Sequence, residues 1–126
     1  MPPLTDDTLW AILNDELDDN TVNRLVWRGL GYQETVAGWD RSAVETAWAE
    51  KYPEPPNFIE SRPATVQLTR SIPREDKQLL KEELGFKGYT VDQLIPRLTR
   101  RATMVSWLLS HRKQQATGDF SSEDNA

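Results

Sequence analysis

Residues 61–109 read SRPATVQLTRSIPREDKQLLKEELGFKGYTVDQLIPRLTRRATMVSWLL, and this stretch decides how the chain folds. Proline suits the first turn of a helix, and glycine suits the position just past its end. Pro73 and Gly85 therefore predict a helix between them. Pro96 predicts a break in the helical pattern, followed by a last helix over residues 97–113.

The last predicted helix carries both an apolar stripe and a basic cluster. We expect its inward face to consist of Leu98, Ala102, Met104, Val105, Trp107, Leu108 and Leu109. Arg97, Arg100 and Arg101 lie one turn apart and share a side that is opposite or oblique to this stripe. The helix therefore has one face for a core and another face that is basic.

Two shorter segments of the same stretch allow more than one interpretation. Residues 64–70 alternate as a strand does, but a preceding proline and apolar residues four apart favour a helix, which we expect. Thr90 can cap a short helix that bears Val91 and Leu94. With the helix that ends at Gly85, this segment outlines a helix-turn-helix, and a helical hairpin that merely packs is the alternative.

The N-terminal part of the chain predicts an antiparallel pair of helices. Thr5 can cap a first helix that ends near Asp18, and a second helix of about 11 residues ends at Gly31. The connection over residues 32–40 allows a small hairpin of strands with its turn at Gly38.

A short helix and a proline-rich connector follow. Ser42 and Glu45 fit a capping box at the start of a helix that ends before Pro53. Residues 52–63, YPEPPNFIESRP, contain four prolines. We expect them to form an extended connector across the surface rather than a proline-rich ligand for another protein.

These elements together predict a mainly α fold, a compact single-domain bundle of five to six helices with room for one small hairpin. The helical domain spans residues 1–113, of which residues 1–61 form an acidic half and residues 62–113 a basic half. Residues 114–126, QQATGDFSSEDNA, are polar and without pattern, so they predict a disordered tail.

The charge of the chain is unevenly distributed. Residues 1–61 carry 4 Lys/Arg against 12 Asp/Glu, whereas residues 62–118 carry 11 against 5, within a net charge of −5. The two halves can neutralise each other, or the basic half can meet an anionic partner. No long apolar run or secretory pattern is present, so we expect a cytoplasmic protein that does not span a membrane, with peripheral membrane contact left open.

Few residues of the chain are suited to catalysis or metal binding. There is no cysteine, and the single histidine, His111, lies among basic residues at the end of the last predicted helix, where capping or solvation explains it. The acidic residues 14–20 lack the glycine and the ligand spacing of a calcium loop. We therefore expect no enzyme, no cofactor and no metal site.

Arginine and tryptophan are the strongest binding candidates, because both dominate the energetics of protein interfaces. We predict a surface that faces an acidic partner protein and consists of Arg62, Arg70, Arg74, Arg97, Arg100, Arg101 and Trp107. Pairing of these arginines with the acidic half is the alternative. A helix-turn-helix that binds nucleic acid is the second functional hypothesis, although its second helix offers few basic side chains to a groove.

Four motifs resemble those of a family of small cyanobacterial and plastid proteins that is classed as a domain of unknown function. They are TLWAILNDELDDNTVNRLVWRGLGY, YPEPPNFIESRPATVQLTRSIP, LLKEELGFKGY and PRLTRRAT. The resemblance covers nearly everything before the tail. It implies a photosynthetic cell and a role in assembly or regulation near photosynthesis, and it brings no activity, cofactor or catalytic residue.

Overall fold

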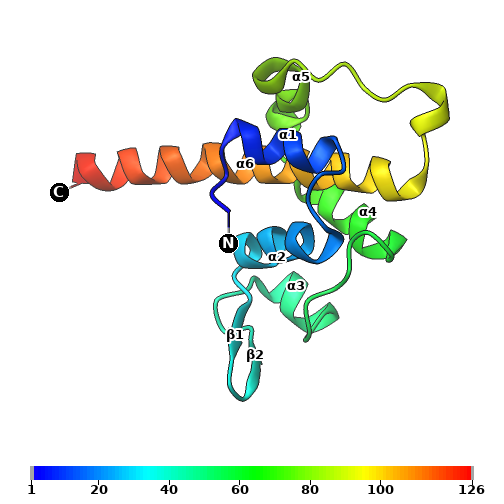
Figure 1. Ribbon diagram of the computed structural model, residues 1–126. Helices are drawn as coiled ribbons and strands as arrows, with labels where there is room; N and C mark the ends of the chain where they lie inside the picture. The colour runs from blue at the N-terminus through cyan, green and yellow to red at the C-terminus, as the bar shows by residue number, and fades with distance from the viewer. Residues whose placement is uncertain (1, 126) are drawn as a thin grey trace.

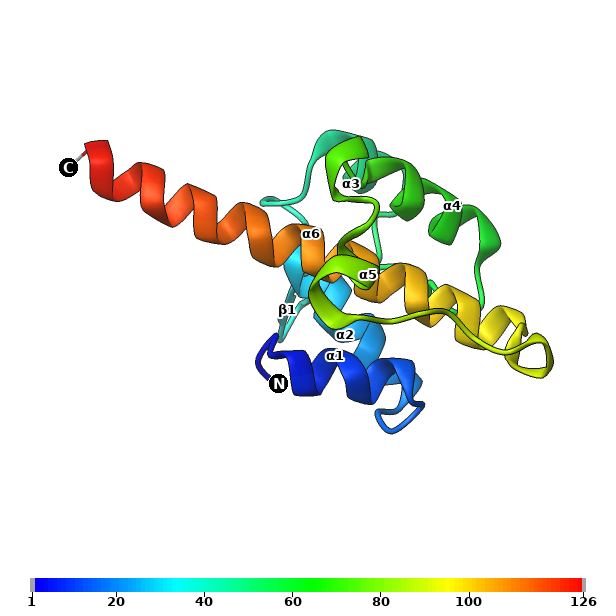
Figure 2. The same ribbon diagram turned by 90° about the horizontal axis from the view of Figure 1, so that it is seen from above.

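Four of the other described helices pack around one long helix, α6 (Pro96–Asn125), as Figure 1 shows. The structure is a computed structural model that describes residues 2–125, with side chains described for residues 2–116. Helices α1 (Asp6–Leu13), α2 (Asp19–Leu30), α4 (Arg62–Ser71) and α5 (Leu79–Leu84) all contact α6. Figure 2 places α1 and α2 on one side of α6, and α3 (Thr46–Lys51) and α4 on the other.

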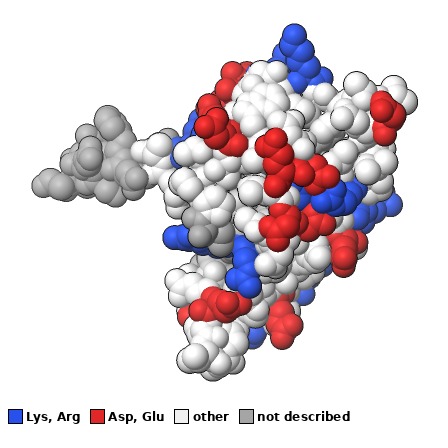
Figure 3. Space-filling view, in the orientation of Figure 1, with Lys and Arg blue, Asp and Glu red and all other residues white. Residues whose placement is uncertain are grey.

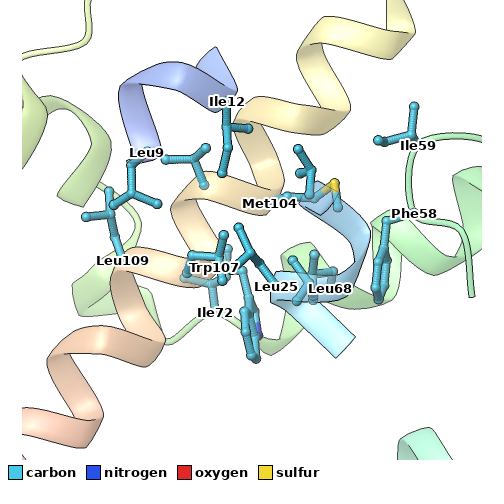
Figure 4. Packing of buried hydrophobic residues seen from close by; sticks show 14 of the residues in the cluster. Leu9, Ile12, Leu25, Phe58, Ile59, Leu68, Ile72, Met104, Trp107 and Leu109 are labelled. Carbon is cyan, nitrogen blue, oxygen red and sulfur yellow. The ribbon is translucent and has the colours of Figure 1, made fainter. Parts of the chain in front are cut away.

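The core forms where α6 meets these helices. Met104, Val105 and Leu108 of α6 have no exposed surface, and the same holds for Leu9 of α1 and Leu68 of α4. Figure 4 shows side chains from all these segments converging on one cluster. The predicted inward stripe of the last helix is therefore confirmed, apart from Leu98 and Ala102, which are only partly buried.

Several predicted helix ends are confirmed by the backbone. The hydroxyl of Thr5 accepts a hydrogen bond from the amide of Thr8, so Thr5 caps α1 as expected. Gly31 and Gly85 follow α2 and α5 with φ of +107° and +67°. The amide of Phe86 donates to the Leu80 carbonyl at 3.2 Å, which completes a Schellman end.

The predicted hairpin of strands is present and the ambiguous segment is helical. Strands β1 (Gln33–Thr35) and β2 (Gly38–Asp40) pair antiparallel, and Glu34 lies opposite Trp39. Residues 64–70 lie within α4, whose first turn is capped by the Ser61 hydroxyl. The mainly α fold with six helices and one small hairpin is thus confirmed for the described residues.

The first two helices differ from the prediction in length and in packing. Helix α1 ends at Leu13, five residues early, because Asp15 adopts a φ of +60° that no right-handed helix can contain. Helices α1 and α2 then each pack on α6 more than on one another. The two helices therefore do not form the expected antiparallel hairpin, because each packs on α6 instead.

The predicted capping box at the start of α3 was wrong. The helix begins at Thr46, and the amide of Ser42 instead donates to the Asp40 carboxylate at 2.9 Å. The connector over residues 52–63 is extended only in part, because residues 58–60 form a turn and residues 62 and 63 already belong to α4. It is also part of the core, because Phe58 is fully buried. Its backbone is held by Asn23 of α2, whose side-chain oxygen accepts from the Phe58 amide at 3.0 Å.

The outline of a helix-turn-helix is not formed by the described residues. The predicted helix after Pro73 is divided into a 3₁₀ turn, η1 (Arg74–Asp76), and α5. The second helix is a single 3₁₀ turn, η2 (Val91–Gln93), closed by a capping box between Thr90 and Gln93. Val91 and Leu94, which were expected to pack on the first helix, are 88% and 58% exposed.

The break predicted at Pro96 is confirmed, because α6 begins there. Gln114, Gln115 and Ala116, the first residues of the predicted tail, continue this helix. The rest of the predicted disordered tail, residues 117–126, lies outside the residues whose side chains are described.

Candidate functional site

Arg101 of α6 is buried completely and holds the turn between α1 and α2. Its guanidinium group donates to the Ile12 carbonyl at 3.1 and 3.3 Å and to the Leu17 carbonyl at 2.7 Å. It also pairs with the Asp19 carboxylate at 2.7 Å. Arg101 thereby donates to carbonyls on both sides of the turn that follows α1.

Arg97 binds the same turn from the surface. It binds Asp15 with two nitrogens, at 2.8 and 2.7 Å, and reaches Asp19 at 3.0 and 3.2 Å. The hydrogen bond from Arg97 holds the pKa of the Asp15 carboxyl below its usual value, and both carboxylates raise the pKa of Arg97. The arginines thus neutralise the acidic turn between α1 and α2. This is the pairing within the chain that the sequence left open as the alternative to a partner.

Three of the residues predicted to bind a partner are used within the fold. Arg101 has no exposed surface and Trp107 is only 9% exposed. Arg100 is partly buried and donates to the Ile59 carbonyl at 2.8 Å. Arg97 remains partly exposed, but its guanidinium group is engaged with Asp15 and Asp19. On the face drawn in Figure 3, basic and acidic side chains accordingly lie next to each other.

His111 does not sit at a helix end as expected. It lies within α6 and stacks on Trp107, with ring centroids 5.1 Å apart and planes 8° from parallel. Partial burial lowers the pKa of His111. Its neighbours Arg112 and Lys113 pair with Asp6, Glu83 and Asp76. The basic residues Arg112 and Lys113 therefore form ion pairs within the chain as well.

Arg62, Arg70 and Arg74 remain exposed, and none of them forms an ion pair with a residue that the structure describes. Arg62, Val66 and Arg70 are four residues apart, so they form one outward stripe of α4, while Ala64 and Leu68 face the core. With Lys51 at the end of α3, the stripe lines a shallow depression of about 470 Å³. We call Lys51, Arg62, Val66 and Arg70 the α3–α4 basic face.

A second surface lies between α2 and the hairpin of strands and was missed by the sequence analysis. Trp27 of α2 and Trp39 of β2 meet edge to face, with ring centroids 5.5 Å apart. They line an open groove of about 450 Å³, and Arg24, Arg28, Tyr32 and Glu34 contribute to its walls. We call this the Trp27–Trp39 groove. The signal in the sequence was the position of Trp27 beside the apolar stripe of its helix rather than within it.

The side chains that the structure describes contain no group of three or more histidine or acidic residues that could hold a metal ion. The buried carboxylate is Asp76, which accepts from Ser110 Oγ at 2.7 Å and from Lys113 Nζ at 2.6 Å. These hydrogen bonds, from Lys113 first, keep its pKa below the usual value.

No helix among the described residues is long and apolar enough to cross a bilayer. A search of the curated proteins finds no match to the chain. A solved structure described as a solution NMR structure is 56% identical, with a TM-score of 0.78 over 92% of this chain and 98% of the other. A family model described as a domain of unknown function, DUF1823, matches residues 3–113. The chain therefore belongs to the DUF1823 family.

Proposed function

We propose that this domain is a non-enzymatic protein-interaction module whose α3–α4 basic face binds an acidic surface of a partner protein. The observation that carries the proposal is the contrast between two sets of arginines. Arg97, Arg100 and Arg101 are used within the fold, whereas Arg62 and Arg70 stand exposed on one stripe of α4 without an ion-pair partner among the described residues.

The chemistry of this face suits a folded or helical acidic segment. Guanidinium groups bind carboxylates with two parallel hydrogen bonds, which gives both strength and direction. Val66 is 37% exposed between the two arginines and provides an apolar contact. Lys51 extends the positive charge across the depression to α3. An acidic partner with one apolar residue between its carboxylates would match all four positions.

The partner is to be sought in a photosynthetic cell. The resemblance to cyanobacterial and plastid proteins supports this source, together with a role in assembly or regulation. The first measurement is therefore affinity capture from a cyanobacterial lysate, in which the proteins captured by the wild-type chain and by charge-reversed variants are quantified.

The discriminating variant is Arg62→Glu/Arg70→Glu, and Lys81→Glu/Lys87→Glu is its matched control, since both lysines are exposed outside this face. We expect the arginine variant to lose the captured partner and the lysine variant to keep it. A purified partner should then bind more weakly as salt increases, because exposed charges are screened. Equal capture by all three proteins, or no capture, would overturn the proposal.

Nucleic acid is the alternative partner of the same face. It predicts retention on a DNA or heparin column that falls with added salt and is lost in Arg62→Glu/Arg70→Glu. If the chain is retained in this way and captures no protein, nucleic acid replaces the acidic protein as the proposed partner of the α3–α4 basic face. Passage through the column at low salt would exclude this alternative.

A further inference from the structure

The Trp27–Trp39 groove is built as a binding site that is separate from the α3–α4 basic face. Three aromatic rings, Trp27, Tyr32 and Trp39, line it together with polar and charged side chains from α2 and β1. The volume of about 450 Å³ lies in the range of sites that accept a ligand or a large side chain. No other part of the described surface combines two partly exposed tryptophans with arginines.

The aromatic side chains of the groove are held in place before any partner arrives. The indole N–H of Trp27 donates to the Pro56 carbonyl at 2.6 Å, and Trp39 packs edge to face on Trp27. Tyr32 is buried, and its hydroxyl donates to the Tyr52 carbonyl at 2.6 Å. Binding therefore requires little ordering of these rings, which lowers the entropic cost of association.

The rim of the groove leaves hydrogen-bond donors and positive charge available. Arg28 is exposed and forms no ion pair with any described residue. Arg24 has a single 3.5 Å contact with the exposed Glu34. The indole N–H of Trp39 donates to no acceptor among residues 2–116. A ligand that brings an apolar group and a carboxylate would satisfy both the rings and the rim.

A peptide suits this geometry better than a nucleic acid or an enclosed small molecule. Glu34 lies on the rim and the first 61 residues are strongly acidic, so a chain of many phosphates would be repelled more strongly than a segment with a single carboxylate. The neighbouring strands are short and exposed, so they leave the groove open on one side. An open aromatic corner with arginines on its rim is typical of peptide hot spots.

We propose that the Trp27–Trp39 groove binds a short segment of a partner protein in which an acidic residue adjoins an aromatic or large aliphatic residue. The apolar side chain packs into the corner formed by Trp27 and Trp39. The carboxylate pairs with Arg28 and accepts from the indole N–H of Trp39. This site does not depend on the α3–α4 basic face, and one partner could use both surfaces.

The test is selection of displayed random peptides of 12 residues on the full chain, followed by affinity measurements with the enriched peptides. We expect the enriched peptides to share an acidic residue beside an aromatic or aliphatic residue. Each should bind Trp39→Ala and Arg28→Glu at least about tenfold more weakly than the wild-type chain. Arg62→Glu/Arg70→Glu, which alters only the α3–α4 basic face, should bind them as the wild type does.

Thermal unfolding of each variant is followed by circular dichroism to confirm that it is folded. Should Trp39→Ala prove unstable, Arg28→Glu alone decides, because Arg28 is exposed and its substitution leaves the core intact. No enriched peptide, peptides without an acidic residue, or equal binding to Arg28→Glu would overturn the proposal. Binding of a labelled single-stranded oligonucleotide that Trp39→Ala abolishes would replace the peptide by nucleic acid.

Discussion

Arg101 is the largest side chain that the described fold buries completely, and it is a charged one. Its burial is tolerated because three hydrogen bonds to backbone carbonyls and one to the Asp19 carboxylate surround the guanidinium group. A buried charge without such partners would strongly destabilise the folded state. The residue thus links the turn between α1 and α2 to the central helix.

Arg101→Met should therefore be among the most destabilising substitutions in the chain. It removes the donors that Arg101 gives to the Ile12 and Leu17 carbonyls and leaves Asp19 without this partner, so we expect the free energy of unfolding to fall by about 3 kcal/mol. Arg70→Met, at an exposed position of α4, should change it by less than about 0.5 kcal/mol. Urea unfolding at neutral pH measures both values, and similar values for the two variants would contradict this role of Arg101.

Asp76 makes the free energy of unfolding depend on pH in the acidic range. Its pKa is below the usual value, so the folded state binds its proton less readily than the unfolded state does. The resulting stabilisation is fully present above the unfolded pKa of about 3.9 and is lost as the pH falls through the folded pKa. Asp76→Asn cannot titrate. We expect its unfolding free energy to fall less steeply than that of the wild type between about pH 5 and pH 3. Urea curves at several pH values measure this, and parallel profiles would count against it.

At the scale of elements, the helix ends depend on two glycines in the left-handed region whose surroundings differ. A Cβ atom at Gly85, after α5, would meet nothing within 4 Å. A Cβ atom at Gly31, after α2, would lie 2.7 Å from the Ala43 carbonyl oxygen, which belongs to the backbone. Substitution at Gly85 therefore adds only backbone strain, whereas substitution at Gly31 adds a collision as well.

The two alanine variants should separate these effects. We expect Gly85→Ala to lower the free energy of unfolding by about 1 kcal/mol, because an L-residue is strained at this φ. Gly31→Ala should lower it by about 2 kcal/mol or more, since the hairpin side of α2 must shift. Gly85→Asn should cost less than Gly85→Ala, because asparagine enters this conformation more readily. A larger loss for Gly85→Ala than for Gly31→Ala in urea unfolding would refute the comparison.

At the scale of the whole molecule, α6 joins the two sequence halves into one core. Helices α1 and α2 come from the acidic half, and α4 and α5 come from the basic half, yet all four pack on α6. Ion pairs also connect α6 to other segments: Arg97 and Arg101 with Asp19, Arg112 with Asp6 and Glu83, and Lys113 with Asp76. The described core is therefore continuous across the whole fold.

A continuous core of this kind should unfold in a single cooperative transition. Trp10, Trp27, Trp48 and Trp107 report on four different helices, and circular dichroism at 222 nm reports on all of them. We expect the midpoints of thermal unfolding from tryptophan fluorescence and from circular dichroism to coincide. Two separate transitions would show that the acidic and basic halves are independent units.

The ends of elements were predictable because their signals are local. Thr5, Gly31, Gly85 and Pro96 act through their own backbone conformation or on amides a few residues away, and each has the predicted effect. The capping box at Ser42 failed for a similar local reason, because Asp40 offered its amide a closer acceptor. Short polar side chains compete for the same donors, and sequence spacing does not decide between them.

The sequence by itself determined the helical class, several of the helix ends and the strong asymmetry of charge, because these depend on residues close together in the chain. Only the tertiary structure decided which arginines are available to a partner. Arg97, Arg101 and Arg70 look alike in sequence, but Asp19 and Ile12 engage the first two across about 80 to 90 residues of chain. The meeting of Trp27 with Trp39 was decided in the same way, because it requires the hairpin to fold back on α2. Burial and pairing are properties of contacts between distant segments, and these contacts exist only once α6 has brought the segments together.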